Sequence, residues 1–141
     1  MRRRPIELPT LALVNQRTDE ALAEYIEVAV TRRARRKGLL GRDAIGEACA
    51  LILAPCAAIH TMFMRFDIDA VFVDEDGCAV KIVRGMTPWR IAANVSAHAV
   101  VELASGTLSE NDITIGDRLY LVAPTGDRVG LSVSGLRERL C

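Results

Sequence analysis

The stretch that decides the fold is residues 56–77, with the sequence CAAIHTMFMRFDIDAVFVDEDG. Its second half alternates in the manner of a β-strand with one buried face. Asp76-Gly77 supplies the positive φ angles that a tight hairpin turn needs, and residues 78–83, which are apolar except for Lys81, then form the returning strand. His60, Arg65 and Asp69 interrupt this pattern where burial is expected. Because a buried ionisable group needs a partner or a function, the same stretch predicts both a hairpin and a candidate site.

Further short strands are expected on both sides of this hairpin, over residues 24–30, 49–54, 97–104 and 117–123. Thr31 is expected to cap a short helix over 32–37 that ends at Gly38, and the segment 107–110 fits the capping box of another. Short strands separated by turns, without long helices between them, predict a mainly β fold. We expect a compact antiparallel β-sandwich or partly open barrel with two or three short helices.

The expected domain organisation has three parts. Residues 1–23 form an N-terminal arm, residues 24–123 form the β domain, and residues 124–141 form a C-terminal extension packed on the domain or trailing from it. The 141 residues suit a single domain. The 18 basic and 18 acidic residues cancel, so net charge gives no reason to expect a nucleic-acid partner or a membrane partner.

Cellular location is inferred from what the sequence lacks. It has no apolar run of signal-peptide length, and none reaches the ~18 residues that suggest a membrane span. Its four cysteines are too sparse for a disulfide scaffold, so reduced thiols in a cytoplasmic protein are the simplest interpretation. The sequence makes no prediction of the oligomeric state.

Several fragments, taken in order along the chain, carry a family resemblance. They are RKGLLGR at 36–42, IHTMFMRF at 59–66, Ile68-Asp69, Asp76-Gly77, Pro88-Trp-Arg90, Val101-Glu-Leu103, Gly106 and Gly116-Asp117. Together they resemble domain of unknown function 192, a bacterial and archaeal family also called uncharacterised protein family 0127, over about residues 24–123. The resemblance implies a compact, mostly antiparallel β-sandwich with short helices. It implies no known reaction, cofactor or substrate.

A candidate binding cleft is assembled from polar and aromatic residues in or beside these strands. Its members are His60, Arg65, Asp69, Trp89, Arg90 and Glu102. The arginines would hold an anionic group, Trp89 would form an apolar wall, and Asp69 would orient the arginines. This predicts a ligand-binding or accessory module for a small anionic ligand. Structural roles are the competing interpretation, with Asp69 in an ion pair that fixes the sheet and Trp89 capping the core.

Two other function classes stay open. A small hydrolase or lyase would use Asp69 or Glu102 as base and His60 as acid. A protein-interaction module would use the basic segment 32–37, although a solvated helix is its ordinary interpretation. No cofactor or metal is expected, because Cys49, Cys56, His60 and His98 match none of the compact zinc spacings. Cys56 as a nucleophile beside His60 lacks an evident third group to orient the pair.

Overall fold

The computed structural model describes residues 11–140 of the chain. A five-stranded sheet lies at its centre, with the strand order β3-β4-β9-β6-β7. These strands are β3 (Tyr25–Ala29), β4 (Cys49–Leu53), β9 (Ala99–Ala104), β6 (Ile68–Val73) and β7 (Ala79–Met86). All six residues of β6 are buried, as expected for a central strand between two antiparallel neighbours. The predicted hairpin is confirmed, with Gly77 at φ 85° in its turn.

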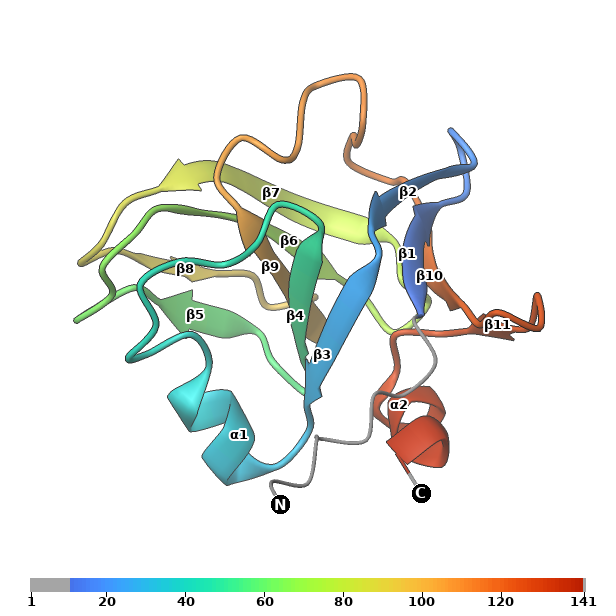
Figure 1. The fold of residues 1–141 in the computed structure, drawn as a ribbon, viewed down its shortest axis with the longest axis horizontal. Coiled ribbons are helices and arrows are strands. Elements are labelled where there is room, and N and C mark those ends of the chain that lie inside the picture. Colours follow the sequence, from blue (N-terminus) through green and yellow to red (C-terminus); the bar gives the residue numbers. More distant parts are fainter. Residues whose placement is uncertain (1–10, 141) are drawn as a thin grey trace, which may run out of the picture.

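One pair of strands in this sheet is parallel rather than antiparallel. β3 and β4 run in the same direction, and the connection between them carries α1 (Arg32–Lys37). A parallel pair needs a crossover connection, which carries α1 away from the strand plane (Figure 1). The helix has the predicted ends: the Thr31 hydroxyl accepts a hydrogen bond from the Ala34 amide, and Gly38 closes the helix at φ 45°.

A second sheet packs beside the first and has the order β11-β10-β1-β2. Its strands are β1 (Ala12–Asn15), β2 (Glu20–Ala23), β10 (Leu119–Val122) and β11 (Arg128–Val129). The prediction of an N-terminal arm outside the β domain is therefore wrong for residues 12–23, which belong to this sheet. Leu13 is buried, and β1 pairs with β10 over its whole length. The remaining residues of that predicted arm, 1–10, lie outside the described residues.

The core consists of two apolar clusters on opposite faces of the five-stranded sheet. Val71, Val101 and Leu103 face the second sheet, and the C-terminal helix α2 (Val133–Leu140) contributes Leu136 to the same cluster. Phe72 and other residues face a two-stranded sheet of β5 (Ala58–His60) and β8 (Ile91–Ala93). Strand alternation produces this division, because successive side chains point to opposite faces. The mainly β, sandwich-like fold predicted from the sequence is confirmed.

The short helix predicted at residues 107–110 does not form. The backbone amide of Leu108 instead donates to the Asp69 carboxylate, and the Ser109 amide donates to Asp112. Long-range hydrogen bonding to Asp69 therefore replaces the local capping box.

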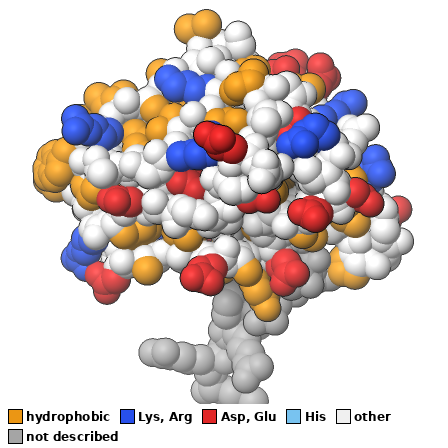
Figure 2. Space-filling view, turned by 90° about the horizontal axis from the view of Figure 1, so that it is seen from above, with side chains coloured by type: hydrophobic (Ala, Val, Ile, Leu, Met, Phe, Trp, Pro, Cys, Tyr) orange, Lys and Arg blue, Asp and Glu red, His pale blue; other side chains and the backbone are white. Residues whose placement is uncertain are grey.

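Acidic and basic side chains are interspersed on the face shown in Figure 2, as expected for a chain with no net charge. Within residues 11–140, no helix combines the length and the apolar character needed to cross a bilayer.

Candidate functional site

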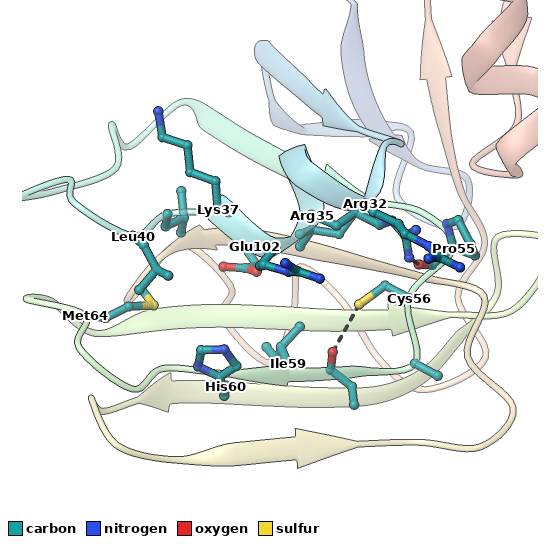
Figure 3. Close-up of a pocket in the computed structure, with 16 residues that line it drawn as sticks. Arg32, Arg35, Lys37, Leu40, Pro55, Cys56, Ile59, His60, Met64 and Glu102 are labelled. Atoms are coloured by element: carbon teal, nitrogen blue, oxygen red, sulfur yellow. Dashed lines mark hydrogen bonds between the residues drawn. The ribbon is translucent and has the colours of Figure 1, made fainter.

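A pocket of about 460 Å³ lies beneath α1, between this helix and β5 (Figure 3). We call it the α1 pocket. Its lining residues are Arg32, Arg35, Arg36, Lys37, Gly38, Leu39, Leu40, Leu53, Pro55, Cys56, Ala57, Ala58, Ile59, His60, Met64 and Glu102. The volume falls within the roughly 300–1,000 Å³ of small-molecule sites.

Glu102 reaches the pocket because of the register of β9. It is paired with Leu51 of β4 on one side and with Ala70 of β6 on the other. All three residues therefore share the sheet face that looks toward α1 and β5, while Val101 and Leu103 point to the other cluster. The central strand β9 thus places a carboxyl group in the pocket, among apolar neighbours.

Glu102 is a buried residue that lines the α1 pocket. The residue is 6% exposed, and among the described residues its side chain makes no hydrogen bond or ion pair. Burial raises the pKa of Glu102 to about 7, and the more distant Arg42 guanidinium lowers it only in part. Arg42 is held instead by Glu27, at 2.7 Å. The Glu102 carboxyl group therefore changes between its protonated and ionised forms near neutral pH.

The opposite side of the pocket is strongly basic. Four cationic side chains of α1 line it, although none of the helix residues is buried. Nη1 of Arg35 donates to the Pro55 carbonyl at 2.7 Å, but its Nε is buried and has no hydrogen-bond partner within residues 11–140. The helix is thus held over the pocket by its caps and by this bond rather than by core packing.

Cys56 and His60 enter the same pocket from the segment that leads into β5 and from β5 itself. The Cys56 thiol donates to the Ala58 carbonyl at 3.1 Å, and burial raises the pKa of this thiol above its ordinary value. Cys56 is therefore a neutral thiol near neutral pH, which does not favour a nucleophile. Within residues 11–140, no group of three or more His, Cys, Asp or Glu side chains is arranged to hold a metal ion.

Of the six residues predicted for a single cleft, the structure brings together His60 and Glu102 in the α1 pocket. Asp69 faces the other side of the sheet, because the register places it opposite Leu103. Its carboxylate accepts hydrogen bonds from the backbone amides of Gly85, Gly106 and Leu108 at 2.8–3.1 Å. The ion pair predicted for Asp69 is therefore wrong, because its donors are backbone amides rather than arginines.

Arg65, Trp89 and Arg90 also lie outside the lining of the α1 pocket. Arg65 forms an exposed ion pair with Asp43 at 2.7 Å. Trp89 is 59% exposed and contacts Phe63, with ring centroids 4.7 Å apart. Both aromatic residues have positive φ, and the side chain of Arg90 is exposed. The interpretation of Trp89 as a cap on the core is wrong.

Several pocket residues were missed as site candidates, although the sequence carried a signal for some. The run of cations in 32–37 was considered as an interaction surface, and the Cys56–His60 spacing was considered for metal and nucleophile chemistry. No local pattern marks Leu39, Leu53 or Met64, since their role depends on how α1 folds back over the sheet.

The family of this chain is known from its similarity to other proteins. The model of the family DUF192, described as an uncharacterized ACR, matches residues 13–121. The chain belongs to the DUF192 family. Its resemblance to this family is thereby confirmed, and no curated protein matches this DUF192 chain.

Two solved structures resemble this DUF192 chain. A protein of unknown function from Novosphingobium aromaticivorans DSM 12444 is 21% identical, with a TM-score of 0.69 over 82% of this chain and 89% of that chain. A putative transcription regulator from Sinorhizobium meliloti 1021 is 20% identical, with a TM-score of 0.67 over 79% and 91%. At these identities the similarity establishes the fold alone.

Proposed function

We propose that this DUF192 chain is a binding module that takes a small anionic ligand in the α1 pocket. The observation that carries the proposal is the convergence of four cationic side chains and one buried, unpartnered carboxyl group on one cavity. The cations outnumber the single carboxyl group, so the potential inside favours an anion.

Unsatisfied polar atoms support a ligand over a purely structural arrangement. Leaving a buried polar group without a partner costs about 1–3 kcal/mol, and most buried polar groups in proteins are paired. One such atom, Nε of Arg35, belongs to this pocket, and the Glu102 carboxyl in the same pocket makes no hydrogen bond with a described residue. A bound molecule with complementary groups would pair with both.

The pocket also has an apolar part. Leu39, Leu53, Ile59 and Met64 line it and belong to the apolar cluster on this face of the sheet. Small-molecule sites commonly combine such a wall with a few polar groups that fix orientation. We therefore propose a ligand with an anionic end, placed toward α1, and an apolar body.

The proposal is tested by titrating the protein with an anion panel and following amide chemical shifts by NMR. The panel contains a carboxylate, a sulfonate and a phosphate monoester, each with a phenyl group. We expect at least one to shift pocket residues, and Arg36→Gln to weaken its binding several-fold. Arg33→Gln is the matched control, because Arg33 lies on the same helix, carries the same charge and does not line the pocket. No binding, or equal weakening by both variants, would contradict the proposal.

An acid–base enzyme is the second candidate. Glu102 and His60 line one cavity, and the pKa of Glu102, about 7, suits proton transfer at neutral pH. Asp69 has no part in this candidate, since it faces the other side of the sheet and accepts three amide hydrogen bonds. Hydrolysis of a carboxylate ester that is abolished by Glu102→Gln would favour the enzyme over the binding module.

The protein-interaction alternative through residues 32–37 remains a prediction. Four cations of this segment line the pocket, whereas Arg33 is exposed and does not line it. An interaction surface would depend on Arg33 as much as on Arg36, so the same pair of variants separates the two ideas. The cytoplasmic location inferred from the sequence also stays a prediction.

A further inference from the structure

We propose that the ligand of the α1 pocket is a small carboxylate with an apolar body, and that its binding takes up one proton onto Glu102. The inference rests on the proposed function and specifies its ligand class and its dependence on pH. Its basis is that Glu102 and four cationic side chains of α1 line a single cavity.

The first step concerns the surroundings of Glu102 on the sheet. A row of paired residues crosses β3, β4, β9 and β6, formed by Glu27, Leu51, Glu102 and Ala70. The two residues beside Glu102 are apolar and offer it no side-chain donor. A ligand group that reaches this part of the pocket therefore meets a carboxyl group whose hydrogen-bonding capacity is unused.

The second step concerns charge. An ionised Glu102 would repel a bound anion, whereas a protonated Glu102 carries one O–H that can donate to it. The two carboxyl groups then share one proton and one negative charge, while the arginines of α1 donate to the ligand from the other side. When Glu102 is ionised in the free protein, that proton must come from solution, and the net reaction is ligand carboxylate plus proton plus protein to complex.

The third step selects the ligand class. The cationic donors of the pocket all come from one element, α1, while Ile59, Leu53 and Met64 provide apolar walls elsewhere. A carboxylate has two coplanar oxygens, which one arginine fork and one O–H can satisfy. A phosphate monoester has three oxygens and up to two charges, and it needs donors from several directions. The one-sided arrangement of donors therefore favours the carboxylate.

Other ionisable groups near Glu102 were considered for the same role. They are Arg32, Arg35, Arg36 and Lys37 on α1, Arg42 with its partner Glu27, Cys49 on β4, and Cys56 and His60 at β5. Burial makes the Cys56 thiol harder to ionise than usual. His60 is the residue chosen for a control variant, because it lines the same pocket as Glu102.

The test uses 4-phenylbutanoate as the probe and its neutral amide as the ligand control. Affinity is measured by calorimetry from about pH 5.5 to about pH 8.5, and proton uptake is measured directly with a pH electrode in weakly buffered solution. We expect close to one proton taken up per ligand at the alkaline end and close to none at the acid end. The apparent Kd should rise toward tenfold per pH unit once Glu102 is ionised in the free protein, whose pKa is about 7.

Two variants make the assignment specific. Glu102→Gln should bind the probe with no proton uptake and with a Kd that no longer rises at alkaline pH, because its amide donates without a proton from solution. His60→Gln should keep the uptake seen in the parent protein at about pH 8.5. Uptake that survives in Glu102→Gln, or that disappears in His60→Gln alone, would assign the proton to another group and overturn the inference.

The remaining outcomes separate this inference from the proposed function. If the probe binds in the α1 pocket without proton uptake, the inference is overturned and the binding module stands. If phenyl phosphate shifts pocket residues while 4-phenylbutanoate does not, the carboxylate class is wrong and the binding module again stands. If none of the anions shifts the pocket residues, both proposals are overturned.

Discussion

Asp69 and Glu102 are buried carboxyl groups on neighbouring strands, yet only Asp69 has hydrogen-bond donors. Three backbone amides point to Asp69, from Gly85 at the end of β7 and from the turn after β9. Glu102 lies on the opposite sheet face and has none among the described residues. The sequence presents the two residues in the same way, as acids within apolar strands. Asp69 is therefore held in a structural position, whereas the carboxyl group of Glu102 is available to a ligand.

Replacing Asp69 is predicted to destabilise the fold. Asp69→Ala leaves three amides without their acceptor, and the free energy of unfolding should fall by about 3 kcal/mol or more. Asp69→Asn should also destabilise, because its NH₂ group would face donors. Urea unfolding of both variants measures these changes, with Asp67→Ala as the control, because Asp67 is an exposed acid just before β6. Unfolding of Asp69→Ala within error of the parent would show that the amides find other acceptors.

Replacing Trp89 is predicted to change stability little. The residue is 59% exposed, and its described aromatic contact is with Phe63, which is 73% exposed. We expect Trp89→Ala to lower the free energy of unfolding by about 1 kcal/mol or less, the scale of a single aromatic pair. Thermal and urea unfolding measure the change. A loss of about 3–5 kcal/mol, as for truncation of a buried aromatic residue, would contradict the exposed position.

Among the elements, those with a strong local signal were predicted well. The β6–β7 hairpin follows from alternation and Asp76-Gly77, and α1 follows from Thr31 and Gly38. β1 was missed because a four-residue strand has little periodicity of its own, and because one of its two partners, β10, lies at the other end of the chain. The site was predicted only in part for a similar reason. Alternation places Asp69 and Glu102 within their own strands, but only the register between β6 and β9 shows that they face opposite ways.

Gly77 is predicted to be essential for joining the β6–β7 turn to β10. It has φ 85°, its carbonyl accepts from the Leu119 amide at 2.9 Å, and an added Cβ would lie 2.5 Å from the Leu119 carbonyl oxygen. The added methyl group in Gly77→Ala must therefore displace backbone atoms. We expect the free energy of unfolding to fall by about 2 kcal/mol or more. Gly126→Ala is the matched control, since Gly126 has φ 89° and open space around it. Equal losses in the two variants would reduce the effect to the φ angle alone.

At the scale of the whole molecule, two acids make stability depend on pH in opposite ways. Burial raises the pKa of Asp117, but hydrogen bonds from Arg17, Asn15 and Thr114 outweigh it and leave that pKa below its usual range. Its contribution is present above the unfolded pKa and is lost as pH falls through the folded pKa. Glu102 has a raised pKa, so its contribution is present below the unfolded pKa near 4.5 and is lost as pH rises to about 7.

Removing the charge at Glu102 is therefore predicted to stabilise the fold at alkaline pH. A shift from 4.5 to about 7 corresponds to about 3 kcal/mol, so Glu102→Gln should gain up to this amount at about pH 8 and little below about pH 4.5. Urea unfolding at both pH values gives the comparison, and the exposed Glu47→Gln serves as the control. A gain that is independent of pH would mean that packing, rather than ionisation, causes it.

Because α1 has no buried residues, the rate at which its amide hydrogens exchange and the rate at which a ligand enters the pocket should both be affected. Its six residues are held by two caps and by the Arg35 bond to Pro55, so the helix can unwind without exposing the core. Its amide hydrogens should exchange with solvent far faster than those of β9, and a ligand bound beneath it should slow that exchange. The rate at which a ligand enters the pocket would then depend on the local unfolding of one short helix. Entry would not require either sheet to unfold.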